Sequence, residues 1–355
     1  MTSPIRTGLD GFDDEAAGQV EFFASRSPTH ARLLETARAL LARDLVTRSL
    51  VEDAWRERAF HARYERPLLL CAAIRFDALR DPAHPLARAI ATEPPDDETI
   101  TEQAVRNALA RPLALDLLKD ASVQTNEVTR AVVWQWPLAM MDIAGPIALA
   151  DVGCSAGLNL VADRIEISWI DESGTPLPSH PRGIALRLGF DRSPIDVRDL
   201  DHADWLRACM WPGQVDRLHR LEAAIGRARE ALSTGELVLS TADLLDVPRH
   251  LDIVARAEKP ALVYAYQTIV RDYLDPDVRD RYQAAMHDWL RAHPGTTLWA
   301  EFERGARDAP EPAELRVSFA QGEAIRSLVL ARADYHPERL RVDRAALAEL
   351  CAPLG

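Results

Sequence analysis

The chain has 355 residues, a formal net charge of -13 at pH 7 and four cysteines. Its length is enough to bury a substantial core, and its acidic balance argues against nucleic acid or an anionic membrane surface as a partner. The cysteines lie far apart with no Cys-x-x-Cys pair, which is typical of a reducing compartment and argues against a disulfide framework or a zinc site.

The start of the chain is polar and acidic, whereas a signal peptide needs a basic start and an apolar run. The longest apolar run, residues 68–74, is too short to span a bilayer. We therefore expect a cytoplasmic protein that has no membrane partner.

Residues 1–144 carry the pattern of an all-α N-terminal domain. Ser27 and Pro28 offer an N-cap followed by proline at the first helical position, and apolar residues then recur at helical spacing. The same spacing predicts helices at residues 67–79, 99–118 and 126–143. We expect this helical domain to contribute to a substrate site.

Residues 145–355 change to short β-branched or aromatic runs that alternate with helical segments. Seven strands are predicted, at residues 147–152, 184–190, 237–240, 261–266, 297–302, 315–319 and 325–331. Helical segments separate the first five strands, at residues 158–164, 203–232, 247–257 and 277–293. This alternation predicts an α/β domain with a Rossmann-like, doubly wound, mostly parallel seven-stranded sheet. The last two strands should form an antiparallel hairpin at one edge, and a small hairpin is expected as an insertion near residues 165–183.

The turn after the first predicted strand fits two chemistries. Gly153-Cys-Ser155-Ala-Gly157 has the Gly-x-Ser-x-Gly spacing of the nucleophile elbow of α/β-hydrolases. Together with Asp151 it also fits a cofactor loop, in which small residues let a ligand lie against the backbone.

The hydrolase interpretation requires several strands before the serine, and an upstream loop that supplies an oxyanion donor. The preceding residues are predicted to be helical, and no such loop is present. Asp272 or Asp308 with His336 would have to complete a triad with Ser155. We therefore keep this interpretation as the less favoured alternative.

The cofactor interpretation draws on three acids at three successive strand ends. A doubly wound sheet binds its ligand outside the carboxyl ends of its strands, at the switch point beside the first strand. Asp151 ends the first strand, Asp191 follows the second and could accept hydrogen bonds from both ribose hydroxyls, and Asp243 follows the third and could accept from an adenine amino group. The alternative is that these aspartates cap the helices that follow. Asp171 is a rival to Asp191, since it also ends a strand.

Four segments between Ala150 and Glu301 resemble class I S-adenosylmethionine-dependent methyltransferases. They are DVGCSAG, GFDRSPID, TADLLDVP and HPGTTLWAE. The departure is Ser155, which stands where that family has the middle glycine of its loop. The resemblance implies S-adenosylmethionine as cofactor and a sheet of methyltransferase type. The cofactor-binding residues that it implies are Asp151 for the methionine side, Gly153, Ser155, Gly157, Asn159, Asp191, Asp243 and Tyr264.

Four other segments, spread over nearly the whole chain, resemble a bacterial family catalogued as domain of unknown function twenty-three thirty-two. They are QTNEVTR, VGCSAGLNL, LGFDRSPIDV and CMWPGQVDR. That family has no settled activity, so the resemblance supports the fold and supplies no substrate.

Polar residues gather at the head of the helix predicted before the first strand. Gln124, Asn126, Glu127 and Arg130 exceed what an N-cap at Thr125 or Asn126 requires, so we predict that they reach the acceptor site. Glu127 or Tyr266 is a candidate base if the acceptor needs deprotonation.

Aromatic and amide groups are the remaining candidates for the acceptor site. Gln267 could orient a polar group, and Trp211 and Tyr273 could line an apolar acceptor or a sulfonium cation. The alternative for each aromatic residue is packing.

The leading hypothesis is a methyltransferase that uses S-adenosylmethionine on a small-molecule substrate. The alternatives are a non-catalytic sensor on the same fold, because the YAYQ segment at 264–267 is no recognisable catalytic tetrapeptide, and a serine hydrolase. No metal is expected, because no pair of histidines has metal-ligand spacing.

Overall fold

The computed structural model describes residues 7–91, 97–124, 126–306 and 309–352. Its two compact units are discontinuous in sequence. The first combines Met1–Thr125 with Asp199–His219, and the second combines Asn126–Arg198 with Arg220–Gly355. The expected division at residues 144 and 145, into a helical and a Rossmann-like domain, stays a prediction.

The first unit is helical. It contains α1 (Phe12–Phe23), α2 (Pro28–Arg43), α3 (Leu45–Trp55), α4 (Glu65–Arg80), η1 (Ala87–Ala91), η2 (Asp97–Thr99), α5 (Glu102–Leu109), α6 (Pro112–Asp120), α8 (Leu200–Ala208) and the start of α9 (Val215–Thr234). Pro28 opens α2 as predicted, although the Ser27 hydroxyl donates to the Pro212 carbonyl (2.7 Å) and does not cap the helix. The single helix predicted at 99–118 is two helices, because Pro112 starts a new one.

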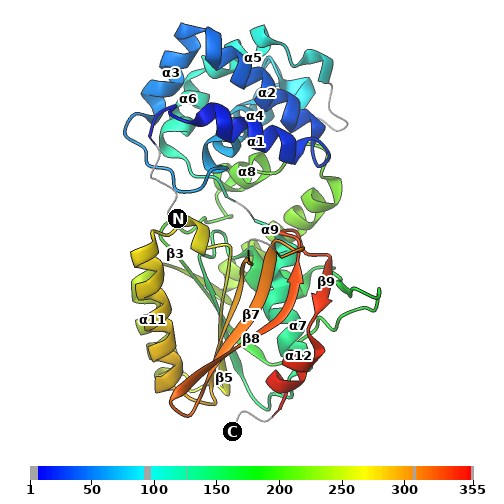
Figure 1. Cartoon of the computed structure of the whole chain (residues 1–355), viewed down its shortest axis with the longest axis vertical. Coiled ribbons are helices and arrows are strands. Elements are labelled where there is room, and N and C mark those ends of the chain that lie inside the picture. Colours follow the sequence, from blue (N-terminus) through cyan, green and yellow to red (C-terminus); the bar gives the residue numbers. More distant parts are fainter. Residues whose placement is uncertain (1–6, 92–96, 125, 307–308, 353–355) are drawn as a thin grey trace. The chain divides into compact units, whose positions relative to one another are not determined.

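The second unit is built on a mixed nine-stranded sheet (Figure 1). Its strands are β1 (Ile147–Val152), β2 (Ile170–Asp171), β3 (Ile184–Asp191), β4 (Leu237–Thr241), β5 (Leu262–Thr268), β6 (Thr297–Arg304), β7 (Ala313–Gln321), β8 (Ala324–Ala333) and β9 (Arg339–Val342). Their order is β2-β9-β8-β7-β6-β5-β1-β3-β4. The strands from β4 to β6 in this order pair in parallel, whereas β7 is antiparallel to β6 and to β8.

The α/β class and the mostly parallel centre were predicted, but the seven-strand expectation was wrong. β2 has only two residues, and β9 is a four-residue run with two arginines, so neither has the apolar pattern that predicts a strand. These two strands extend the sheet beyond β8, and the β7–β8 hairpin therefore does not lie at the edge. A tight turn does form at Asp171, whose amide donates to the Thr175 carbonyl (2.9 Å).

Helices cover both faces of the sheet. The remaining elements of this unit are η3 (Val128–Ala131), α7 (Val132–Met140), η4 (Leu158–Arg164), η5 (Leu244–Asp246), α10 (Val247–Ala257), η6 (Arg271–Tyr273), α11 (Pro276–Ala292) and α12 (Arg344–Leu350). Val263 and Ala265 of β5 pack in one apolar cluster with α10 and α11. Because side chains alternate along a strand, Tyr264 and Tyr266 point to the other face, where the Tyr264 hydroxyl donates to the Val133 carbonyl of α7 (2.7 Å).

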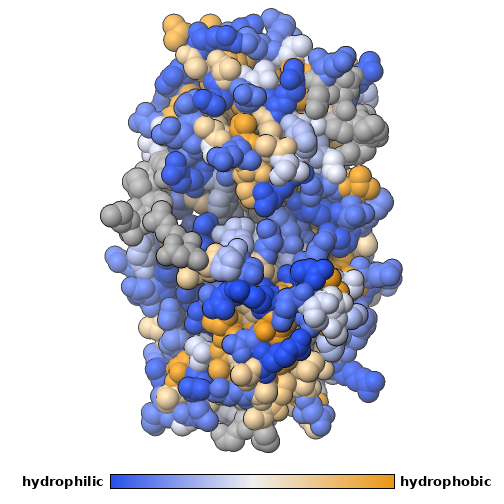
Figure 2. Space-filling view, turned by 45° about the vertical axis from the view of Figure 1, so that its right-hand side comes forward, coloured by the Kyte–Doolittle hydropathy of each residue, from blue (hydrophilic) through white to orange (hydrophobic). Residues whose placement is uncertain are grey.

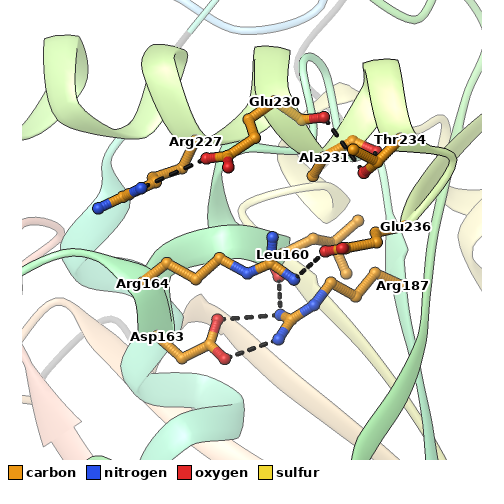
Figure 3. A network of polar contacts seen from close by, with 9 residues as sticks. All are labelled: Leu160, Asp163, Arg164, Arg187, Arg227, Glu230, Ala231, Thr234 and Glu236. Carbon is orange, nitrogen blue, oxygen red and sulfur yellow. Dashed lines mark hydrogen bonds and ion pairs between the residues drawn. The ribbon is translucent and has the colours of Figure 1, made fainter.

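An ion pair joins η4 to the sheet beside the glycine-containing turn (Figure 3). The Arg187 guanidinium of β3 binds both carboxylate oxygens of Asp163 (2.9 and 2.6 Å) and also donates to the Leu160 carbonyl. Both side chains are mostly buried, so this bidentate ion pair fixes η4 against β3.

Hydrophilic residues dominate the face drawn in Figure 2, with hydrophobic ones exposed between them. No helix in the described part of the chain is long and apolar enough to cross a bilayer.

Candidate functional site

The carboxyl ends of the parallel strands define one edge of the sheet. β1 pairs with β3 on one side and with β5 on the other. The strand order therefore reverses at β1, because β3 and β4 are added on one side of it and β5 and β6 on the other. Such a switch point is where open α/β sheets bind ligands. The loops after β1, β3, β4, β5 and β6 all begin at this edge.

The turn after β1 is folded tightly onto β3. The Gly153 amide donates to the Phe190 carbonyl (2.8 Å), and the Ser155 amide donates to Asp191 Oδ2 (2.8 Å). Gly153, Ser155 and Gly157 all have positive φ, of 77°, 52° and 67°. The serine, which replaces the expected middle glycine, therefore occupies a backbone conformation that costs a non-glycine residue energy.

Close packing explains both glycines of this turn. A Cβ atom at Gly157 would lie 2.9 Å from Leu239 Cδ2, and one at Gly153 would lie 2.7 Å from Val270 Cγ2. Together with the positive φ, these contacts favour glycine at both positions, whether or not a ligand approaches.

We expect Gly157→Ala to lower the free energy of unfolding by about 2 to 4 kcal/mol, because it combines a left-handed backbone with a steric clash. The matched control is Gly235→Ala, which has a similar φ of 77° and open space around the added methyl group. Urea unfolding of both variants separates the two effects. Equal losses would show that the contact with Leu239 is unimportant.

Two of the three predicted acids, Asp191 and Asp243, lie at strand ends and have carboxylate lone pairs that can accept further hydrogen bonds. Asp191 accepts from the amides of Ser155 (2.8 Å) and Ser193 (3.0 Å) with different oxygens. Each carboxylate oxygen has a second lone pair, so a ligand hydroxyl can still bind. Asp243 is exposed and accepts from the Leu245 amide (3.1 Å). Its Oδ2 lies 3.4 Å from Nη2 of Arg192. Its contacts match the helix-cap alternative, and its cofactor role stays a prediction.

The rival Asp171 is fully used by its own turn. Its carboxylate accepts from Ser173, Thr175 and Arg344. The Ser173 hydroxyl is the main contributor that holds the pKa of Asp171 well below its usual range. Because β2 is the terminal strand on the side of the sheet opposite β4, Asp171 lies far from the turn after β1.

Asp151 forms a buried pair with Tyr266 beneath the turn. The Tyr266 hydroxyl donates to Asp151 Oδ2 (3.0 Å), and both side chains are buried. Burial raises the pKa of Asp151 to about 8, and the nearby Asp191 adds to this increase. Burial also raises the pKa of Tyr266 well above its usual value, with Asp151 contributing. Asp151 is therefore mainly protonated at pH 7, and Tyr266 is a poor candidate for a base.

Gln267 supports the loop after β5 from the opposite face of the sheet. Its Nε2 donates to Glu303 Oε1 (2.8 Å), and its Oε1 accepts from the Tyr282 hydroxyl (2.8 Å). Glu303 also accepts from the amides of Val270 and Arg271, and burial raises its pKa to about 7. The amide of Gln267 therefore has internal partners at both ends, and its predicted catalytic role stays a prediction.

The loop that Glu303 holds has a strained backbone. Ile269 has a φ of 54°, which is a rare conformation for a β-branched residue. Tyr273 follows in η6 and is half-buried. Strain of this kind persists only where the surroundings enforce it, and here Glu303 does so.

Glu127 and Arg130 meet the segment between β8 and β9. Glu127 Oε2 lies 2.8 Å from His336 Nδ1, and Arg130 Nε donates to the Tyr335 carbonyl (2.9 Å). Asn159, with its amide oriented so that Nδ2 donates, binds the carbonyls of Glu127 (3.3 Å) and Val128 (3.2 Å). The structure thus brings the predicted residues Glu127, Arg130 and Asn159 together. It adds His336, which was a candidate only for the serine hydrolase alternative.

The other predicted residues do not join this group. Tyr264 uses its hydroxyl on α7, and Asn126 Nδ2 is buried with no acceptor among the described residues. Gln124 and Trp211 belong to the first unit, where Trp211 packs against Phe23 with ring centroids 4.8 Å apart. The possible cap residue Thr125 lies outside the described residues.

The triad of the hydrolase alternative is not assembled in the described residues. Ser155 Oγ is buried with no hydrogen-bond partner there, and Asp308 lies outside the part of the chain that is described. His336 Nδ1 is bound to Glu127 and not to Asp272.

The second unit is therefore a mixed α/β sheet with a switch-point edge lined by acids. Over residues 17–341 the chain matches, and so belongs to, the family described as "Uncharacterized protein conserved in bacteria (DUF2332)". No curated protein and no solved structure matches it. Within the described ranges, no three His, Cys, Asp or Glu side chains gather as a metal site.

Proposed function

We propose that the edge formed by the carboxyl ends of β1, β3 and β4 binds S-adenosylmethionine, and that the protein methylates a small molecule. The observation that carries the proposal is the hydrogen bond from the Ser155 amide to Asp191, which joins the turn and a strand-end carboxylate at the switch point. A seven-stranded sheet of methyltransferase type is not needed for this, because the parallel strands from β4 to β6 supply the edge.

The size of the edge supports an adenosyl ligand. Neighbouring strands lie about 4.8 Å apart, so the ends of β1 and β4, with β3 between them, are roughly 10 Å apart. That distance is comparable with the length of an adenosine. In this arrangement Asp191 binds the ribose hydroxyls, Asp243 binds the adenine amino group, and the backbone of residues 153–157 packs beneath the methionine part.

When bound, S-adenosylmethionine supplies a methyl group on a sulfonium, ready for in-line displacement. The protein's own part is to orient donor and acceptor and to exclude water. Asp151 beneath the turn is mainly neutral at pH 7, and so adds little charge there.

We expect Asp191→Ala to weaken binding of S-adenosylmethionine and S-adenosylhomocysteine by about 10- to 100-fold, because two hydroxyls lose a charged acceptor. Asp243→Ala should cost about 10-fold. Isothermal titration calorimetry on the full chain measures both.

The control is Asp288→Ala, an exposed aspartate of α11, which should bind like the wild type. Asp191→Asn keeps one acceptor oxygen, so it shows whether loss of one of the two contacts, with Ser155 or Ser193, disturbs the turn. Absence of binding at millimolar ligand would reject the proposal, and so would binding that Asp191→Ala and Asp243→Ala leave unchanged.

A non-catalytic ligand sensor is the second candidate. It is favoured by one observation, that Gln267 and Tyr266, two of the predicted catalytic residues, use their polar groups on buried neighbours. Tight binding of S-adenosylmethionine with no methyl consumption in a broad acceptor screen would support it.

A further inference from the structure

The pair formed by the Glu127 carboxylate and His336 lies at the edge of the sheet where the parallel strands have their carboxyl ends. We propose that His336 is the general base that deprotonates the methyl acceptor, and that Glu127 is its positioning residue. This inference rests on the proposed methyl transfer. It replaces the two bases expected from the sequence, Glu127 and Tyr266, by a residue that both the fold and the chemistry favour.

Glu127 is held too firmly to act as the base itself. Its side chain is 3% exposed, Oε1 accepts from the amide and hydroxyl of Thr129 (3.2 and 2.7 Å), and Oε2 binds His336 Nδ1. Tyr266 is completely buried. The His336 side chain is 19% exposed, so of these three groups it alone reaches the surface.

The strand topology puts His336 at the carboxyl edge. β8 runs parallel to β6, because both are antiparallel to β7, and the segment after Ala333 therefore emerges where β6 ends. The Arg304 guanidinium at the end of β6 lies 5.7 Å from the Tyr335 ring centroid and binds Asp272 (2.8 Å), in the loop after β5. His336 thus lies close to the end of β6 and to the loop after β5.

The same pair is tied to the turn after β1. Asn159 lies two residues beyond Gly157 and binds the carbonyls of Glu127 and Val128 through its side chain. Arg130 holds the Tyr335 carbonyl, next to His336 in the chain. The pair therefore lies between the proposed cofactor side of the edge, after β1, and the end of β6 with the loop after β5.

The hydrogen bond decides which ring nitrogen can take a proton. In the proposed arrangement Glu127 accepts a hydrogen bond from Nδ1–H of His336, so Nε2 is the ring nitrogen that takes the proton. In the proposed step Nε2 forms an N–H bond as the O–H or N–H bond of the acceptor breaks. The electron pair of that bond stays on the acceptor atom, and the imidazolium charge is balanced by Glu127.

The chain contains a matched control. His293 Nε2 lies 2.7 Å from Asp252 Oδ1, with 15% of the histidine side chain exposed. His293 lies four positions before Thr297, the first residue of β6, and its carbonyl accepts from the Thr297 hydroxyl, so this second pair lies at the amino ends of the strands. Each pair joins a histidine to a carboxylate, but the bound ring nitrogen is Nδ1 in His336 and Nε2 in His293, and the two pairs lie at opposite ends of the strands.

The first test locates the proton. Long-range nitrogen–proton NMR of the full chain with ¹⁵N-histidine is expected to show His336 with its hydrogen on Nδ1 at neutral pH. Glu127→Gln should change that signal and leave the signal of His293 unchanged. A hydrogen on Nε2 of His336 would overturn the proposal.

The second test measures transfer of the tritiated methyl group of S-adenosylmethionine to a bacterial small-molecule extract. We expect His336→Gln to lower the rate by about 100-fold or more and Glu127→Gln by about 10-fold, with S-adenosylmethionine affinity within about threefold of the wild type. His293→Gln should keep full activity. Added imidazole should partly restore His336→Ala, which a purely structural role of His336 does not predict.

The outcomes separate the two proposals. Normal transfer by His336→Gln rejects the base and leaves the methyltransferase standing. Binding without transfer by the wild type rejects the base and supports the sensor, whereas no binding rejects both proposals.

Discussion

Asp151→Asn is expected to raise the free energy of unfolding at pH 8 by several kcal/mol and to have little effect at pH 4. Burial raises the pKa of Asp151 in the folded protein to about 8, against 3.8 as its ordinary value. Between these two pH values the folded state binds a proton that the unfolded state has released, so stability falls as pH rises. A shift of about four pKa units corresponds to roughly 5 kcal/mol.

Asparagine resembles the protonated carboxyl group, because its amide oxygen still accepts from Tyr266 and it carries no charge. The measurement is urea unfolding from pH 4 to pH 8, with hydrogen exchange of β1 and β5 peptides to locate the effect. Asp171→Asn is the control of opposite sign, because the pKa of Asp171 is lowered by its partners, and so this variant should be less stable than the wild type at pH 7. Parallel pH curves for the wild type and Asp151→Asn would contradict the argument.

Local patterns predicted the centre of the sheet and the turn beside it. The run Ile147–Val152 has six buried residues and predicted β1, and the spacing of Asp151, Asp191 and Asp243 placed three acids at one edge. These features depend on short stretches of sequence and on a topological rule, which is why sequence alone suffices. β9 was missed because Leu340 is the only buried residue of a strand that otherwise carries arginines and a half-buried valine.

Partnerships between distant residues could not be predicted in this way. Glu127 and His336 are 209 positions apart, and Gln267 and Glu303 are 36 apart. No local pattern connects either pair, because their contacts depend on the order of β5, β6, β7 and β8 in the sheet. Sequence signals marked Glu127 and Gln267 as polar residues in unusual places, but could not say that each is bound to a second buried or partly buried group.

These partnerships change the chemical interpretation of the candidate site. Glu127, Tyr266 and Gln267, which were predicted as catalytic, are buried and bind neighbouring groups. Partly exposed to solvent beside Glu127 is His336, in the segment between β8 and β9. The cofactor role expected for Asp191 stays a prediction, and its carboxylate keeps lone pairs available beside the turn.

Glu303→Leu is expected to lower the free energy of unfolding by about 3 to 6 kcal/mol. Leucine removes the acceptor of Gln267 Nε2 and of the amides of Val270 and Arg271, and each buried donor left without a partner costs about 1 to 3 kcal/mol. Glu303→Gln keeps one acceptor oxygen and should lose much less. It should also flatten the loss of stability with rising pH between about 4.5 and 7, because burial raises the pKa of Glu303 from 4.5 to about 7.

Urea unfolding and hydrogen exchange of residues 268–273 measure whether the loop or the whole unit loosens. The control is Glu323→Leu, an exposed position between β7 and β8, which should change stability by no more than about 0.5 kcal/mol. Equal losses for Glu303→Leu and Glu303→Gln would show that the carboxylate does not hold the loop. In that case the left-handed backbone of Ile269 would need another support, and the loop beside His336 could not be treated as fixed by Glu303.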